Sequence, residues 1–139
     1  MPNSKELIAK YMEVFNAKNA EALGEFYNKN AVIQRTNGEP MFGWDELFGY
    51  IKKDLQSAKA RKADNIFEDG EWVILEWSET GGKRGCKIFK IVGEKILVQK
   101  IINQSDFANL LFCHDDFVNL LYKCSQIYII FLPNSINLL

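Results

Sequence analysis

The sequence predicts an α+β domain: a cone-shaped, curved, mostly antiparallel sheet with three N-terminal helices across its concave face. Two observations lead to this fold class. Apolar residues follow helical spacing in most of the chain up to about Ser57. Strand-like segments separated by glycine turns then fill residues 61–103. Strands joined by short turns pair antiparallel, and amphipathic helices cover such a sheet with their apolar faces.

Three segments have the apolar spacing of amphipathic helices. Their predicted bounds are residues 4–17, 20–28 and 44–57. Asn3 and Glu6 have the spacing of a capping box before the first helix, and Asn19 is a suitable N-cap for the second. In the third helix, Leu47, Phe48, Ile51 and Leu55 form the predicted inner face.

The strands are predicted from alternating or continuous apolar runs bounded by turns. Their predicted bounds are residues 31–35, 61–67, 71–79, 83–92 and 95–103, with a short strand around Met41. The run from Trp72 to Leu75 is apolar on both faces, so we expect cover from helices on one side and from a partner subunit on the other.

Composition limits the function classes. A length of 139 residues predicts one domain. A net charge of -1 gives no reason to expect a nucleic-acid partner. The three cysteines form no CxxC pair and His114 is the single histidine, so neither a metal site nor a cofactor is predicted. No signal peptide and no membrane span are recognised, and the cytoplasm is the expected compartment.

The chain divides into two unequal parts, predicted as a domain at residues 1–104 and an apolar extension at residues 105–139. The last 35 residues hold four charged side chains, and DFANLLF recurs there as DFVNLLY. This extension is either a pair of short helices or one broken helix, packing on the body or on a partner subunit, or it is the product of reading through a lost stop codon.

Several segments within residues 4–104 resemble one superfamily of cone-shaped domains. They are YMEVFNAKN, EFYNKNAVI, GEPMFGWDEL, WVILEW and GEKILVQKIIN. Together they are similar to the nuclear transport factor 2-like superfamily, which includes ketosteroid isomerases, SnoaL-like polyketide cyclases and scytalone dehydratase. The resemblance implies a cystatin-like roll with an apolar pocket between helices and sheet, while the reaction stays open because this fold hosts many functions.

The ketosteroid isomerases align without a gap from Tyr11 to Arg35. The resemblance places Tyr11 at their oxyanion-hole tyrosine. Their catalytic base, an aspartate, falls on Arg35, which stays protonated and cannot abstract a proton. Their second oxyanion donor, a protonated aspartate, falls near Cys86 or Lys87, and neither side chain is a carboxylic acid. Ketosteroid isomerase activity itself is therefore not expected.

The same comparison assigns the faces of the strand at residues 71–79. It turns Val73, Leu75 and Trp77 inward and leaves Glu76 on the outer face, which the resemblance makes the dimer side. A register shift of one residue would exchange the faces. Glu76 would then be the best candidate for a general base.

The predicted catalytic residues are Tyr11, as a hydrogen-bond donor, and Arg35, as a fixed cation for a carboxylate or an enolate. The predicted ligand-binding residues are Phe15, Tyr27, Phe48, Trp77 and Cys86. Each also fits a structural role, as a core aromatic, a rim arginine or a small buried thiol. The expected ligand is a small apolar or carboxylate-bearing molecule.

Two functions remain open. The first is a SnoaL-like small-molecule-binding domain with an apolar pocket, in which isomerase, cyclase or hydratase activity stays open. The second is a non-catalytic dimerisation or protein-interaction module of the same fold. In both, we expect a homodimer through the outer face of the sheet.

Overall fold

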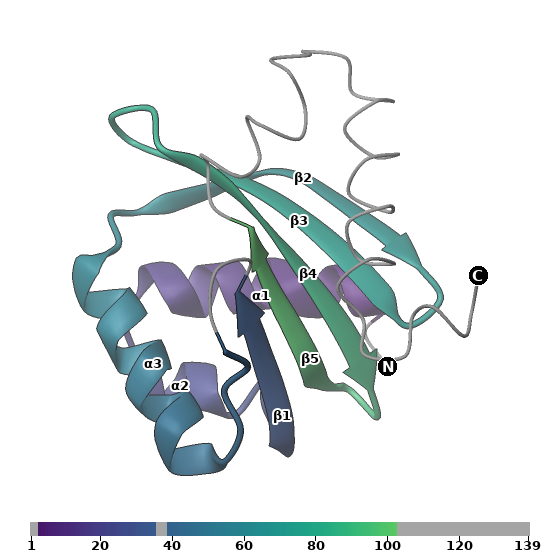
Figure 1. Ribbon diagram of the computed structural model, residues 1–139. Coiled ribbons are helices and arrows are strands. Elements are labelled where there is room, and N and C mark those ends of the chain that lie inside the picture. The colour runs from purple at the N-terminus through teal and green to yellow at the C-terminus, as the bar shows by residue number, and fades with distance from the viewer. Residues whose placement is uncertain (1–2, 36–38, 103–139) are drawn as a thin grey trace.

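A computed structural model describes residues 3–35 and 39–102 (Figure 1). The elements are α1 (Ser4–Asn16), α2 (Ala20–Gly24), β1 (Tyr27–Arg35), α3 (Trp44–Ser57), β2 (Arg61–Asp69), β3 (Trp72–Glu79), β4 (Arg84–Val92) and β5 (Lys95–Ile102). The predicted extension at residues 105–139 and the predicted end of the last strand at Asn103 lie outside the described residues.

The five strands form one curved, unclosed sheet in the order β1-β5-β4-β3-β2. β2, β3, β4 and β5 pair antiparallel with their neighbours in sequence, as the turns predict. β1 pairs parallel with β5, so the first and last strands of the described chain are neighbours in the sheet. The predicted α+β fold with a mostly antiparallel sheet is confirmed, and the predicted strand at Met41 is a single bridge to Ile33.

The three helices lie on one side of the sheet (Figure 1). α1 packs against β2 and β3, whereas α3 packs against β1 and α2. The predicted capping box of α1 is present: the Asn3 side chain accepts from the Glu6 amide, and the Glu6 side chain accepts from the Asn3 amide. Asn19 caps α2 in the same way as predicted, through the amide of Ala22.

The predicted length of the second helix is wrong. α2 ends at Gly24, and Tyr27 already belongs to β1, where it is paired with Ile96. Phe26 and Tyr27 continue the apolar helical spacing, which is why the pattern extends the helix too far. In the structure the carbonyl of Phe26 accepts from the amide of Ile96, so pairing with β5 satisfies this backbone in extended form.

The core fills the space between the helices and the sheet. Its largest fully buried aromatic side chains are Tyr11, Phe15 and Phe89. Val73, Leu75 and Trp77 of β3 all face this core, so the predicted register of that strand is confirmed. Glu76 lies on the opposite face of the sheet, as alternation along a strand requires.

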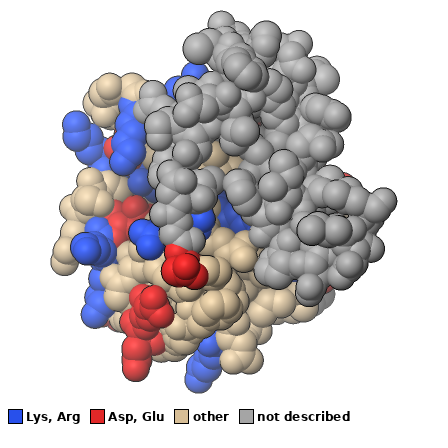
Figure 2. All heavy atoms as spheres, viewed as in Figure 1, with Lys and Arg blue, Asp and Glu red and all other residues tan. Residues whose placement is uncertain are grey.

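The visible surface carries both signs of charge. Figure 2 shows lysine and arginine side chains interspersed with aspartate, glutamate and uncharged residues on the face viewed. This agrees with the net charge of -1. No helix within the described part of the chain is long and apolar enough to cross a membrane.

Candidate functional site

Tyr11 lies at the centre of the core. Helical spacing on α1 turns Ile8, Tyr11, Met12 and Phe15 toward the sheet, and Tyr11 is 1% exposed. Its ring meets that of Phe89 edge to face, with centroids 5.2 Å apart. Because the ring is fixed on several sides, its hydroxyl has a defined position in the interior.

A chain of hydrogen bonds runs from β4 through two tyrosines to β5. Lys87 Nζ donates to the Tyr11 hydroxyl at 3.3 Å, and the Tyr11 and Tyr27 hydroxyls are 3.2 Å apart. The Tyr27 hydroxyl donates to Gln99 Oε1, so its oxygen is free to accept from Tyr11. Burial raises the pKa of Tyr27 well above its ordinary value, which keeps this hydroxyl protonated.

Lys87 enters the core from the sheet. Like Phe89 and Ile91, it lies on the helix-side face of β4, and it is 3% exposed. Besides Tyr11, its ammonium contacts Asp54 Oδ2 at 3.5 Å. A buried lysine with both a carboxylate and a phenol in reach has partners for two of its three donors.

Asp54 lies in the last turn of α3, on the face that also carries Ile51 and Leu55. A carboxylate near the C-terminal end of a helix is opposed by the helix dipole, so it requires cations nearby. Lys87 contacts one carboxylate oxygen, and Arg61 NH2 lies 3.5 Å from the other. Asp54 is therefore held between two buried cations.

Arg61 opens β2 and is the most constrained member of the site. Its Nε donates to Glu79 Oε2 at 2.8 Å, and its guanidinium carbon lies 3.7 Å from the centroid of the Trp77 ring. The side-chain amide of Asn16 holds its backbone from both sides, accepting from the Arg61 amide at 2.8 Å and donating to its carbonyl at 2.7 Å. α1 and β3 thus fix the position of this guanidinium.

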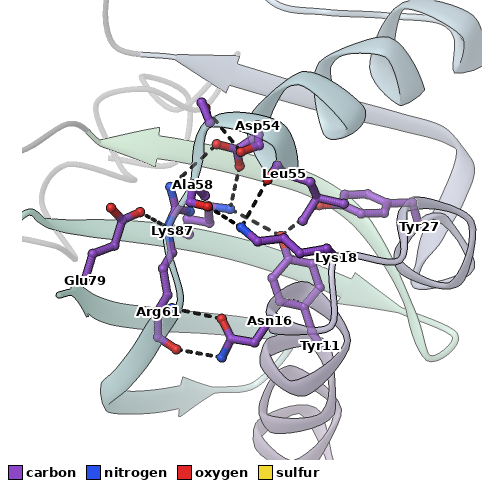
Figure 3. Close-up of polar contacts among 11 residues, drawn as sticks. Tyr11, Asn16, Lys18, Tyr27, Asp54, Leu55, Ala58, Arg61, Glu79 and Lys87 are labelled. Carbon is purple, nitrogen blue, oxygen red and sulfur yellow. Dashed lines mark hydrogen bonds and ion pairs between the residues drawn. The ribbon is translucent and has the colours of Figure 1, made fainter.

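We call Asp54, Arg61, Glu79 and Lys87 the charge cluster (Figure 3). The four side chains come from α3, β2, β3 and β4, and their formal charges sum to zero. Side-chain exposure is 17% for Asp54 and at most 5% for the other three, so Asp54 is the member nearest to solvent. Replacing buried ion pairs by apolar side chains is often neutral or stabilising, so stability alone does not account for the cluster.

Lys18 caps the C-terminal end of α3 beside the charge cluster. Its Nζ donates to the carbonyls of Leu55 and Ala58, which the helix itself leaves without partners (Figure 3). Lys18 adopts a left-handed backbone conformation with φ of 62°, which is strained for a residue with a side chain. A cation at this helix end also opposes the dipole that acts on Asp54.

Trp77 borders the charge cluster on β3. Its ring lies over Gly85, the residue paired with it on β4, and a Cβ at Gly85 would be 2.4 Å from Trp77 Cζ2. Glycine is therefore required at this position for space. Together with the stacked Arg61, this close approach fixes the indole in one orientation.

The structure brings some of the predicted site residues together. Tyr11, Phe15, Tyr27 and Trp77 share the core between helices and sheet. Phe48 is half-buried on α3 and stacks on Trp44, with centroids 5.5 Å apart. Their predicted roles in ligand binding stay predictions.

The two other predicted site residues are Arg35 and Cys86. Arg35 ends β1 with an exposed side chain, and its guanidinium carbon is 6.0 Å from the centroid of the Tyr50 ring. Cys86 is buried, but it alternates with Lys87 and so faces away from the helices. The structure therefore places Cys86 on the face of β4 opposite Lys87, and the predicted role of Arg35 stays a prediction.

Sequence reasoning missed the charge cluster. None of Asp54, Arg61, Glu79 and Lys87 is among the site residues that the sequence predicts. Two of these carried a usable signal: Asp54 follows Ile51 by three residues on an apolar helix face, and Glu79 shares the strand face of Leu75 and Trp77. A charged residue within an apolar stripe predicts a buried charge, which requires a partner.

The opposite face of the sheet holds ionisable groups of another kind. Glu76 is 5% exposed, and burial raises its pKa from 4.5 to about 7. Lys100 is 1% exposed, and burial lowers its pKa from 10.5 to about 8. Both shifts favour the neutral form of the side chain.

A surface groove of about 450 Å³ lies between α3 and the start of α2. It is lined by Lys18, Ala20, Lys52, Leu55 and Gln56. No member of the charge cluster lines it. Within residues 3–35 and 39–102, no group of three or more His, Cys, Asp or Glu side chains is placed to hold a metal ion.

The family model of the SnoaL-like domain matches residues 8–99. No curated protein matches the chain. Among solved structures, the epoxide hydrolase/cyclase-like enzyme SalBIII, which acts in pyran ring formation in the polyether salinomycin, superposes with a TM-score of 0.64 at 18% identity. That match covers 73% of this chain and 92% of SalBIII.

Two further structures have the same fold. An NTF2-like protein of unknown function from Cytophaga hutchinsonii has a TM-score of 0.60 at 16% identity, over 81% of this chain and 96% of that one. A protein with a ketosteroid isomerase-like fold from Catenulispora acidiphila, in complex with trimethylamine, has a TM-score of 0.58 at 14% identity. That match covers 71% of this chain and 85% of the other. At these identities the likeness concerns the fold alone.

Proposed function

The chain belongs to the SnoaL-like domain family, and from this premise we propose that it is an acid–base enzyme for a small oxygen-bearing organic molecule. The observation that carries the proposal is the position of Lys87. Its Nζ lies 3.3 Å from the Tyr11 hydroxyl and 3.5 Å from the Asp54 carboxylate, inside the core. A proton donor and a proton acceptor thus contact the same ammonium group.

Asp54 acts as the base in this proposal. It is the member of the charge cluster nearest to solvent, at 17% side-chain exposure, so a substrate that enters reaches it first. Arg61 and Lys87 each contact one of its oxygens and hold the carboxylate in place. An ionised carboxylate can take a proton from a hydroxyl or a water that attacks the substrate.

Tyr11 acts as the acid. The ammonium of Lys87 beside its oxygen stabilises the phenolate that remains after the proton has left. A substrate oxygen then takes the place of Tyr27 as the acceptor of the Tyr11 proton. Lys87 can return a proton to the phenolate and take one from the protonated Asp54, which restores all three groups for the next cycle.

Opening of an epoxide, by water or by a hydroxyl of the same molecule, fits these two roles. The attacking oxygen forms a new C–O bond and gives its proton to Asp54. The epoxide C–O bond breaks, and the leaving oxygen takes the proton of Tyr11. The structural neighbour SalBIII is described as epoxide hydrolase/cyclase-like, which favours this reaction class over other acid–base reactions.

The test is turnover of simple epoxides. Purified protein is incubated with cyclohexene oxide and with styrene oxide, and diol is quantified by gas chromatography. We expect turnover above the rate in buffer, and a loss of about 100-fold or more in Asp54→Asn, because general base catalysis contributes that much. Lys87→Met should lose activity as well.

Lys90→Met is the matched control. Lys90 lies on β4 like Lys87 but on the opposite face of the sheet, with its Nζ 5.8 Å from the centroid of the Trp72 ring. It should turn over the epoxides like the wild type. Equal turnover by Asp54→Asn and the wild type would contradict the proposal, and so would the absence of turnover by the wild type itself.

A second candidate is the non-catalytic dimerisation or interaction module. It is favoured by the packing of the interior, where Tyr11 and Phe15 are each 1% exposed and Phe89 is fully buried. In that case the epoxides neither react nor bind, and the chain forms a stable dimer through the outer face of the sheet. Sedimentation velocity of the wild type would then show a dimer.

A further inference from the structure

The indole nitrogen of Trp77 is a buried donor without an acceptor. Trp77 is 6% exposed, and its Nε1 makes no hydrogen bond to any group that the structure describes. A buried indole N–H usually has an acceptor, and an unsatisfied buried donor is destabilising. Glu76 and Gln34 also have a buried oxygen without a partner, but both lie on the opposite face of the sheet.

Packing alone does not explain a tryptophan here. A phenylalanine would fill much of the same space without burying an unsatisfied N–H. The ring is also fixed rather than adaptable: Arg61 stacks at 3.7 Å, and Nε1 would lie 3.0 Å from a Cβ at Gly85. The surroundings therefore hold a polar edge in place where the fold itself supplies no partner.

The position of this edge relates it to the acid–base site. Gly85, under the ring, precedes Lys87 by two residues on β4, so both face the helices. Glu79, which binds Arg61, follows Trp77 by two residues on β3. Trp77 thus adjoins the charge cluster on the same face of the sheet.

We infer that Trp77 Nε1 is a ligand-binding donor, and that the molecule bound in the cone carries a second acceptor oxygen besides the one that faces Tyr11. This inference rests on the proposed function and narrows its substrate class. The substrate is then a small ring or chain with oxygen functions at two positions, such as a hydroxy-epoxide. Because Nε1 is shielded from water, a hydrogen bond to it is made in a medium of low dielectric constant.

The test uses two ring ketones of the same size, cyclohexanone with one acceptor and cyclohexane-1,4-dione with two. The full-length protein is labelled with ¹⁵N, and its three tryptophans give three indole signals. The signal of Trp77 is assigned by its loss in Trp77→Phe. Both ketones are titrated into the wild type and into Trp77→Phe, which keeps an aromatic ring in the core.

We expect the dione to bind the wild type about three- to tenfold more tightly than cyclohexanone, as one added hydrogen bond predicts. The Trp77 indole proton should move downfield with the dione and much less with cyclohexanone. In Trp77→Phe the preference should fall to the statistical factor of two for a ligand with two equal ends. The control is Trp44→Phe, which replaces a half-buried tryptophan stacked on Phe48. This variant should keep the full preference for the dione.

The outcomes separate the two proposals. Binding of both ketones with equal preference in the wild type and Trp77→Phe, and an unchanged Trp77 signal, overturns the inference and leaves the proposed function intact. Absence of binding for both ketones overturns the inference together with the proposed pocket.

Discussion

The two faces of the sheet bury charge in different ways. On the helix-side face, Arg61 and Lys87 meet the carboxylates of Asp54 and Glu79 at distances between 2.8 and 3.5 Å. On the opposite face, burial moves the pKa of Glu76 up to about 7. On one face the buried groups lie beside side chains of opposite charge, whereas on the other burial shifts a group toward its neutral form.

This difference indicates where chemistry can take place. An acid–base reaction needs a base and a positioned proton donor, and the helix-side face has a carboxylate in Asp54 and a phenol in Tyr11 that both contact Lys87. Charges stay paired in a core only where their positions are well fixed. Here Asn16 of α1 holds the backbone of Arg61, and Lys18 in the following turn holds the end of α3 beside Asp54. The cluster therefore has the properties of a site more than those of a stabilising device.

The largest expected effect comes from breaking the paired face. Arg61→Met removes the partner of Glu79, whose side chain is 5% exposed, and leaves a buried carboxylate unpaired. We expect a loss of about 3–5 kcal/mol in the free energy of unfolding, measured by urea titration. Arg35→Met, in an exposed arginine, should change the same quantity by less than about 0.5 kcal/mol. A similar small loss in both variants would mean that the buried pairing contributes little.

The second prediction concerns the opposite face and pH. Glu76 binds its proton more tightly in the folded state, with a pKa of about 7 against an ordinary 4.5. Stability from this group is therefore present below pH 4.5 and is lost as pH rises to 7. Glu76→Gln stays neutral, so it should match the wild type at pH 4 and exceed it at pH 8, by at most about 3 kcal/mol.

Urea titrations of both proteins at pH 4, 6 and 8 check this prediction. The range stops at pH 8 because the pKa of Lys100 is lowered to about 8, and that group changes stability at higher pH. Glu71→Gln, in an exposed residue before β3, is the matched control and should follow the wild type. A Glu76→Gln variant that loses stability at pH 8 would show that this carboxylate is favourably paired when ionised.

The smallest effect tests the close approach of Trp77 to β4. Gly85→Ala places a Cβ 2.4 Å from Trp77 Cζ2, and the ring cannot move because Arg61 is stacked on it. We expect a loss of about 1–3 kcal/mol in unfolding free energy. Gly49→Ala, on the exposed side of α3 with no atom near the added Cβ, should instead gain about 0.5–1 kcal/mol. Equal effects in the two variants would contradict the fixed position of the indole.

Much of the fold could be predicted because local patterns determine it. Apolar spacing and the cap at Asn3 define α1, and glycine turns separate the antiparallel strands. The segment around Tyr27 could not be assigned from such patterns. Its parallel pairing with Ile96 joins residues far apart in sequence, and no local signal reports a contact of that range.

The site was predictable only in part, for a related reason. Tyr11 came from the family resemblance, and its central position agrees with the structure. The charge cluster draws single residues from α3, β2, β3 and β4, so its members have no common spacing. Arg61, at the first position of a strand, has the same local sequence signal as an exposed arginine and is identified only by its partners.

The central claim is that the charge cluster serves chemistry and not stability. The most direct measurement is the free energy of unfolding of a concerted variant, Asp54→Leu, Arg61→Met, Glu79→Leu and Lys87→Met, against the wild type. Because the four formal charges cancel and leave together, the account predicts a stability equal to or above that of the wild type, although Arg61→Met alone loses about 3–5 kcal/mol. A concerted variant destabilised as strongly as that single variant would show that the cluster holds the fold together, and would contradict the account.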